Sequence, residues 1–156
     1  QYAAMTVQQI AEQQGPQTVA STVPALVNAL VRFPDQAYVT QALKSTKGEA
    51  VAQLIPFLGD AHVEIQEQAV KALNGIGAPA VDAMEPLLRI AEDKSAPVEL
   101  RKQALVTLGS IGEKAVSAIP RIDAIARSVD ALRQTAAMAN KRLKYAKRVR
   151  ETGGDR

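Results

Sequence analysis

One segment of this chain repeats after 35 residues. Leu73–Gly77, with the sequence LNGIG, returns as Leu108–Gly112, with the sequence LGSIG, and small or apolar residues match on both sides of it. A fixed period of this size, made of helical segments, is typical of a solenoid of stacked helix pairs. Such folds usually present a surface to a partner, so the repeat indicates binding before any single residue does.

The repeat can be followed outward, and glycine and proline between its units set the expected helix bounds. We expect helices over Thr6–Gln14, Thr18–Arg32, Gln36–Ser45, Glu49–Leu58, Val63–Ile76, Pro79–Glu92, Pro97–Ile111, Ala115–Ser128 and Asp130–Arg150. The expected fold class is all-α: an α-solenoid of stacked antiparallel helix pairs, forming a superhelix. It makes one domain over residues 1–150, followed by a flexible tail over residues 151–156.

Four prolines fall inside the second helices of the pairs: Pro24, Pro56, Pro86 and Pro120. A proline beyond the first turn removes a backbone hydrogen bond and bends the helix. We therefore expect second helices that are curved or that begin late.

The ends of the first helices carry their own signals. Asp60 and Ser95 are expected to cap these helices at their N-termini with side-chain oxygens. Gly77 and Gly112 are expected to end them, because a residue with positive φ costs least as glycine.

Leucine and alanine should build the core between the helices. We expect Leu73 and Leu108 to be buried at equivalent positions of the two clear repeats. Ala69, Ala72 and Ala104 are small where two helices cross, so the backbones can approach closely.

The unit from Asp60 to Gly77 resembles a HEAT repeat of the short bacterial kind, and the unit from Pro97 to Gly112 resembles it again. Gln66 stands where this motif commonly has arginine, as at Arg101. The resemblance implies a non-catalytic protein-interaction or assembly module, alone or within a larger complex.

The sequence lacks the usual signals of an enzyme. It has no cysteine, no Gly-x-Ser-x-Gly motif and no phosphate-binding loop, and His62 is its only histidine. One HEAT-like enzyme class, resembling deoxyhypusine hydroxylase, binds iron through repeated His-Glu pairs, and this chain has no such pair. We therefore expect neither catalysis nor a cofactor or metal.

The second helices provide the first candidate binding surface, because in stacked helix pairs they line the concave face. Their apolar positions face inward at helical spacing, which leaves polar side chains outside. The partner-binding residues expected on this face are Asn28, Arg32, Gln53, Asp82, Glu85, Arg89 and Arg121. An ordinary polar surface would look the same in sequence.

The last helix provides the second candidate surface. An alanine-rich stripe is expected to dock it on the preceding repeat: Val129, Leu132, Ala136, Ala139, Leu143 and Ala146. Around the stripe lie six cations without an acid: Lys141, Arg142, Lys144, Lys147, Arg148 and Arg150. The whole chain has a net charge of +3, so its remainder carries −3. We expect weak, non-specific binding to polyanions, with a plain helix-end or solubility role as the alternative.

Two other functions stay open on the sequence. A nucleic-acid-binding role would resemble that of HEAT-like alkylpurine DNA glycosylases, although Asp82 and Glu85 oppose a basic groove. A bilin-lyase-like helper is the second alternative, since similar short repeats occur there. No run of apolar residues is long enough to span a membrane. The chain begins at Gln1, which fits either an exported (periplasmic) protein without its leader or a piece of a cytoplasmic one.

Overall fold

The computed structural model describes residues 50–152, together with Ala25, Leu26, Ala29, Arg32 and Gly48. In this part of the chain all regular structure is helical, so the expected all-α solenoid is confirmed. The helices expected before residue 49 lie outside the described residues, apart from those isolated positions. The elements are α5 (Val51–Leu54), η1 (Ile55–Gly59), α6 (Val63–Ile76), η2 (Ala78–Ala83), α7 (Met84–Glu92), α8 (Val98–Ile111), η3 (Gly112–Ala118), α9 (Ile119–Ser128) and α10 (Asp130–Glu151), where η denotes a 3-10 helix.

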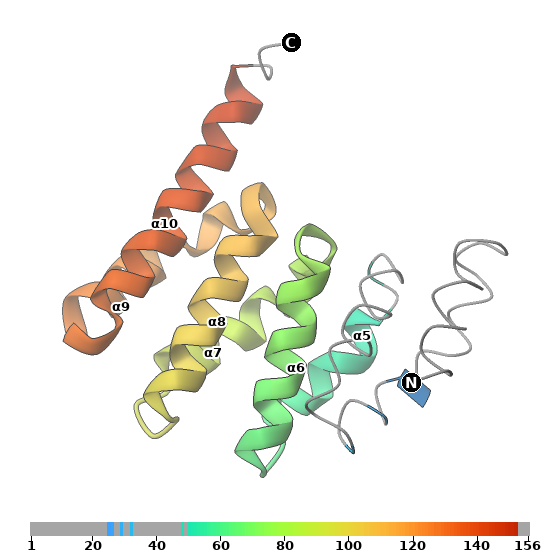
Figure 1. The fold of residues 1–156 in the computed structure, drawn as a ribbon. Helices are drawn as coiled ribbons and strands as arrows, with labels where there is room; N and C mark the ends of the chain where they lie inside the picture. Colours follow the sequence, from blue (N-terminus) through green and yellow to red (C-terminus); the bar gives the residue numbers. More distant parts are fainter. Residues whose placement is uncertain (1–24, 27–28, 30–31, 33–47, 49, 153–156) are drawn as a thin grey trace, which may run out of the picture.

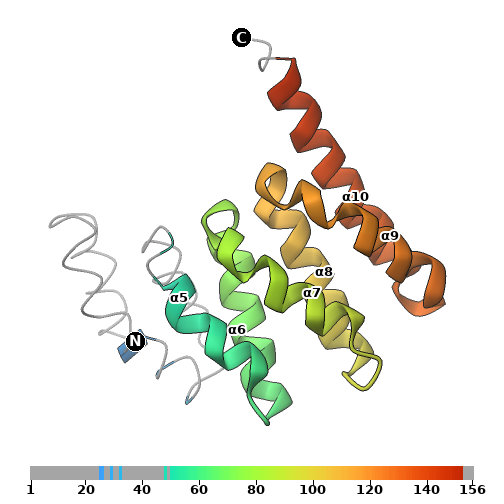
Figure 2. The same cartoon turned by 180° about the vertical axis from the view of Figure 1, so that it is seen from behind.

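The helices form two layers. The first helices of the pairs, α6, α8 and α10, lie side by side in front in Figure 1, and α5, α7 and α9 lie behind them. Figure 2 shows the molecule from behind, with α5, α7 and α9 nearest the viewer. Helix α8 packs against α6, α7 and α10, and α10 packs against both α8 and α9. The upper half of α10 extends past the other helices (Figure 1).

The second helices begin late, as the prolines predict. The segment α5–η1 is an exception, because its α-helix comes first and Pro56 lies near the start of the 3-10 helix that follows. In the next two repeats a 3-10 segment comes first, and the α-helix starts only at Met84 in one and at Ile119 in the other. Pro86 is therefore the third residue of α7, and Pro120 is the second residue of α9. In a first turn the missing N–H has no helical partner to lose, so both prolines fit without breaking a helix. Pro24 lies outside the described residues.

The C-terminal signals of the first helices are confirmed, but the N-terminal ones are wrong. Gly77 and Gly112 both have φ of 72°. The N-caps are His62 and Pro97, and neither makes a side-chain capping bond. The Asp60 carboxylate instead accepts the backbone N–H of His62 at 2.9 Å, within the loop. Asp60 precedes the helix by too many residues to reach its first turn, so it closes an Asx-turn.

Ser95 fails as a cap for the same reason. Its backbone N–H and its hydroxyl both donate to the Asp93 carboxylate, at 2.8 and 2.6 Å. These hydrogen bonds, the hydroxyl's first, lower the pKa of Asp93 from its ordinary value. The Asp93 carboxylate thus stabilises the loop before α8.

The core is built as the repeat predicts. Leu73 and Leu108 are each 0% exposed, and Ala69, Ala72 and Ala104 are buried beside them. The stripe that docks α10 is also confirmed, with Leu132, Ala136, Ala139 and Leu143 buried and Val129 and Ala146 half-buried.

Two equivalent polar side chains tie α6 and α8 each to the end of the second helix before it. Gln66 Nε2 donates to the backbone oxygen of Asp60 at 2.6 Å, and Arg101 Nε donates to that of Ala91 at 3.0 Å. Both acceptors lie at the C-terminal end of a second helix, where carbonyl groups lack helical partners. Glutamine and arginine at this position of the repeat therefore have the same role, which is to donate a hydrogen bond to a backbone oxygen at the end of the preceding helix.

Helix α10 crosses α8 at a glycine. A Cβ atom added at Gly109 would lie 3.2 Å from the Cα of Ala139, closer than side-chain carbons normally approach. Small residues on both helices thus set the distance between α8 and α10.

We expect Leu73→Ala and Leu108→Ala each to lower the free energy of unfolding by about 2–5 kcal/mol, because each leaves a cavity in a packed core. Urea unfolding followed by circular dichroism measures this. Val106→Ala, at an exposed position of α8, is the control and should cost less than about 1 kcal/mol. Losses below about 1 kcal/mol at both leucines would contradict the shared register.

Candidate interaction surfaces

The outward side chains of α5, η2, α7 and α9 form one surface, which we call the second-helix face. Asp82, Glu85 and Arg89 are exposed on it, as expected. Gln53 of α5 is half-buried. Arg32 has helical backbone and is exposed. Asn28 lies outside the described residues.

Arg121 is bound to two acids of the neighbouring repeat. Its Nε and Nη2 donate to the two carboxylate oxygens of Glu92 at 2.6 and 2.5 Å, and its Nη1 donates to Glu85 at 2.6 Å. The Glu92 contact is bidentate, the geometry that fits guanidinium to carboxylate best. Sequence reasoning placed Arg121 on this face but could not show that its side chain bridges α9 and α7.

These contacts change the pKa values of Glu92 and Arg121. The hydrogen bond from Arg121 lowers the pKa of Glu92 below its ordinary value. The hydrogen bonds to Glu92 and then Glu85 raise the pKa of Arg121. Glu92 and Arg121 therefore stay charged at neutral pH, and the charge of Arg121 is balanced within the protein.

The side chains of Asp82 and Arg89 are more available than that of Arg121 for contact with a partner. The Arg89 side chain is 76% exposed, and its Nε lies 3.7 Å from Glu85. Asp82 forms no ion pair with any described residue. The second-helix face thus combines an ionic bridge between repeats with exposed charges of both signs.

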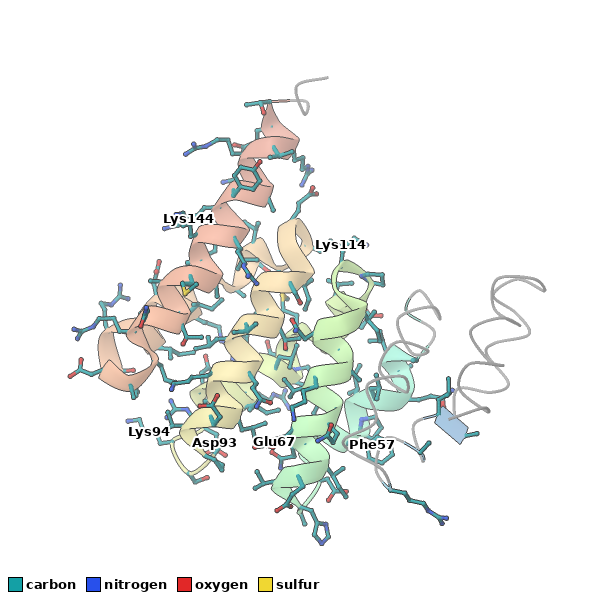
Figure 3. All side chains as sticks on the ribbon, viewed as in Figure 1. Phe57, Glu67, Asp93, Lys94, Lys114 and Lys144 are labelled. Atoms are coloured by element: carbon teal, nitrogen blue, oxygen red, sulfur yellow. The ribbon has the colours of Figure 1, made fainter. Side chains whose placement is uncertain are left out.

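The six cations over residues 141–150 of α10 are all exposed, but they differ in their neighbours. Lys147 lies 3.7 Å from Glu151, and Arg150 lies 3.2 Å from Glu113. The other four form no ion pair with the described residues: Lys141, Arg142, Lys144 and Arg148. In Figure 3, Lys144 points away from α8.

A groove that the sequence did not suggest lies between α9 and α10. Its volume is about 450 Å³, and Lys141, Lys144 and Arg148 line it together with Asp123 and Asn140. Asn140 is buried, and its Nδ2 donates to the Asp123 carboxylate at 2.5 Å. A polar residue within the apolar stripe of the last helix was the signal that could have found this pair.

Other kinds of site gain no support from the described residues. His62 is exposed, and its Nδ1 lies 2.9 Å from the Asp60 carboxylate, in the loop before α6. Within this part of the chain, no three residues among His, Cys, Asp and Glu come close enough to hold a metal ion. None of the helices described has the length and apolar character needed to cross a bilayer.

Comparison with known proteins identifies the repeat. Residues 51–141 match the family described as HEAT repeats. No curated protein matches the chain. A solved structure described as an engineered protein of the Northeast Structural Genomics Consortium is similar to it, with a TM-score of 0.59 and 21% identity. That likeness covers 92% of this chain and 72% of the other, and it supports the fold alone.

Glu92→Gln should remove the acid-sensitive part of the ionic bridge. The pKa of Glu92 is lowered in the folded protein, so its contribution is present above its ordinary value of 4.5 and is lost as the pH falls below it. We expect the variant to lose about 0.5–1 kcal/mol of unfolding free energy at pH 7, a small value because the side chains are 37% exposed. Urea unfolding at pH 7 and at about pH 3 measures the difference, which should shrink at the lower pH.

Glu67→Gln, on α6, is the matched control and should change the free energy of unfolding by less than about 0.5 kcal/mol at either pH. An equal loss for Glu92→Gln at both values of pH would show that its charge is not responsible.

Proposed function

The chain belongs to the HEAT-repeat family, and from this membership we propose that it is a non-catalytic module that binds a partner protein along its second-helix face. HEAT repeats generally serve as protein-interaction scaffolds rather than as enzymes. Stacked helix pairs produce extended surfaces that suit this role. The proposal assigns partner contact to the side chains of α5, α7 and α9.

The observation that carries the proposal is the bridge from Arg121 to Glu85 and Glu92. It joins two successive second helices, so the side chains around it are held in fixed relative positions. A surface that is ordered before binding loses less conformational freedom when the partner arrives.

The exposed charges on this face supply the chemistry of recognition. Asp82 of η2 and Arg89 of α7 have opposite signs and are both exposed. Complementary charges on a partner would select its orientation and speed its association. We expect Arg32 and Gln53 to extend the contact toward the earlier repeats, and Asn28, outside the described residues, belongs to the same prediction.

The alternatives gain less support. Glu85, Glu92 and Asp82 put acids on the second-helix face, which disfavours a phosphate backbone there. The cations of α10 remain available for weak binding to polyanions. Nothing in the described residues or in the comparisons favours a bilin-lyase-like helper.

A charge swap on the second-helix face should abolish partner capture. Asp82→Lys combined with Arg89→Glu leaves the net charge unchanged but reverses both signs, so complementary contacts become repulsive. The tagged protein and the variant would be incubated with extract of the native source, and retained proteins quantified by mass spectrometry. We expect a protein that the parent retains in stoichiometric amount to fall at least about tenfold with the variant.

The same swap on the other layer is the control. Glu67→Lys with Lys71→Glu lies on α6, in the front layer where Figure 3 labels Glu67, and it also preserves net charge. It should leave capture unchanged. Loss of capture with this control, and retention with the Asp82 and Arg89 swap, would assign the contact to the first-helix layer and contradict the proposal.

A further inference from the structure

The groove between α9 and α10 has an unbalanced charge. It is lined by Asp123 of α9 and by Asn140, Lys141, Lys144, Tyr145 and Arg148 of α10. The three cations form no ion pair with any described residue, so the lining carries three positive charges against one negative charge. This differs from the second-helix face, where Arg121 is already neutralised.

The groove lies where α10 departs from the repeat. Aligning Leu132 with Leu100 places Asn140 at the position of Leu108, and Lys144 at the position of Gly112. In α8 that leucine is fully buried and that glycine ends the helix. Helix α10 instead carries an amide in place of the core leucine and continues to Glu151. The surface next to Asn140 is therefore polar where a repeat would need an apolar one.

Asn140 leaves one hydrogen-bonding atom unused. Its side chain is 3% exposed, and its Nδ2 is bound to Asp123. Its Oδ1 is buried and has no partner among the described residues. A buried acceptor without a donor is unfavourable, and such groups mark places where a missing partner belongs.

We propose that this groove binds an acidic helical segment of a partner protein. Lys141, Lys144 and Arg148 lie on one side of α10 over seven residues, a rise of about 10 Å. A helix with carboxylates at every turn presents its charges at the same spacing. Tyr145, 69% exposed, adds an aromatic ring and a hydroxyl between them.

A protein segment is the occupant we propose because HEAT repeats generally bind proteins, and a nucleic acid is the alternative that the test distinguishes. The Asp123 carboxylate already accepts a hydrogen bond from the amide of Asn140, so the three cations remain for the acidic side chains of the segment. The inference rests on the proposed function in that the ligand is a protein, and it adds a second contact with a defined chemistry.

The test uses a labelled helical peptide of about 18 residues, with glutamates one turn apart on one side and alanine and leucine elsewhere. Binding to the full chain is followed by fluorescence anisotropy at about 0.15 M salt. We expect Lys144→Glu with Arg148→Glu to weaken binding at least about tenfold, because two attractions become repulsions. The same peptide with lysine in place of glutamate should not bind.

Lys94→Glu with Lys114→Glu is the matched control, because it changes the net charge equally. Figure 3 shows Lys94 beside Asp93 and Lys114 at the opposite end of the helices, both away from the side of α10 that carries Lys144. This variant should bind the peptide within about twofold of the parent. An equal loss with both variants would reduce the effect to net charge and overturn the inference.

Two further results would overturn it. One is failure of the glutamate peptide to bind at either low or physiological salt. The other is tighter binding of a labelled DNA duplex than of the peptide at physiological salt, lost with Lys144→Glu and Arg148→Glu, which would promote a nucleic-acid role. The Asp82 and Arg89 swap should leave peptide binding unchanged, so failure of the groove and failure of the second-helix face are separate outcomes.

Discussion

The burial of leucine at the same position of successive helix pairs supports everything else in this structure. No single pair can remove its apolar side from water by itself, so Leu73 and Leu108 are buried only because pairs stack on one another. The polar ties from Gln66 and Arg101 then join each pair to the end of the one before. Because stacking fixes the positions of the helices, it also fixes which side chains meet on the surfaces that a partner could reach.

Much of the fold could be predicted because the repeat signals are local. Gly77 and Gly112 have the positive φ that their place after a helix predicts, and Pro86 and Pro120 fall where the second helices begin. The caps failed because a carboxylate in a short loop can bond a backbone N–H nearer than the helix. Which turn Asp60 closes depends on where the helix starts, and a sequence pattern leaves that uncertain by several residues.

The surfaces were predicted less completely, because the direction of a long side chain depends on neighbours that are distant in sequence. Sequence placed Arg121 outside but not against Glu85 and Glu92, which lie 36 and 29 residues earlier. It placed the cations of α10 outside but did not separate Lys147 and Arg150, which have acidic neighbours, from Lys144 and Arg148, which have none among the described residues. Asn140 was not predicted, because its place within the apolar stripe indicates packing and not a polar pair with Asp123.

The two kinds of tie between repeats should respond differently to their surroundings, with a consequence for the mechanics of the solenoid. The bridge from Arg121 lies at the surface, where dissolved ions screen charges over about 8 Å at physiological salt. The bond from Arg101 to Ala91 is buried and is screened far less. Raising the ionic strength therefore weakens the Arg121 bridge and has little effect on the hydrogen bond from Arg101. The stack becomes easier to bend on the side of α7 and α9 while its core stays intact, so its stiffness is a property of the solution as well as of the chain.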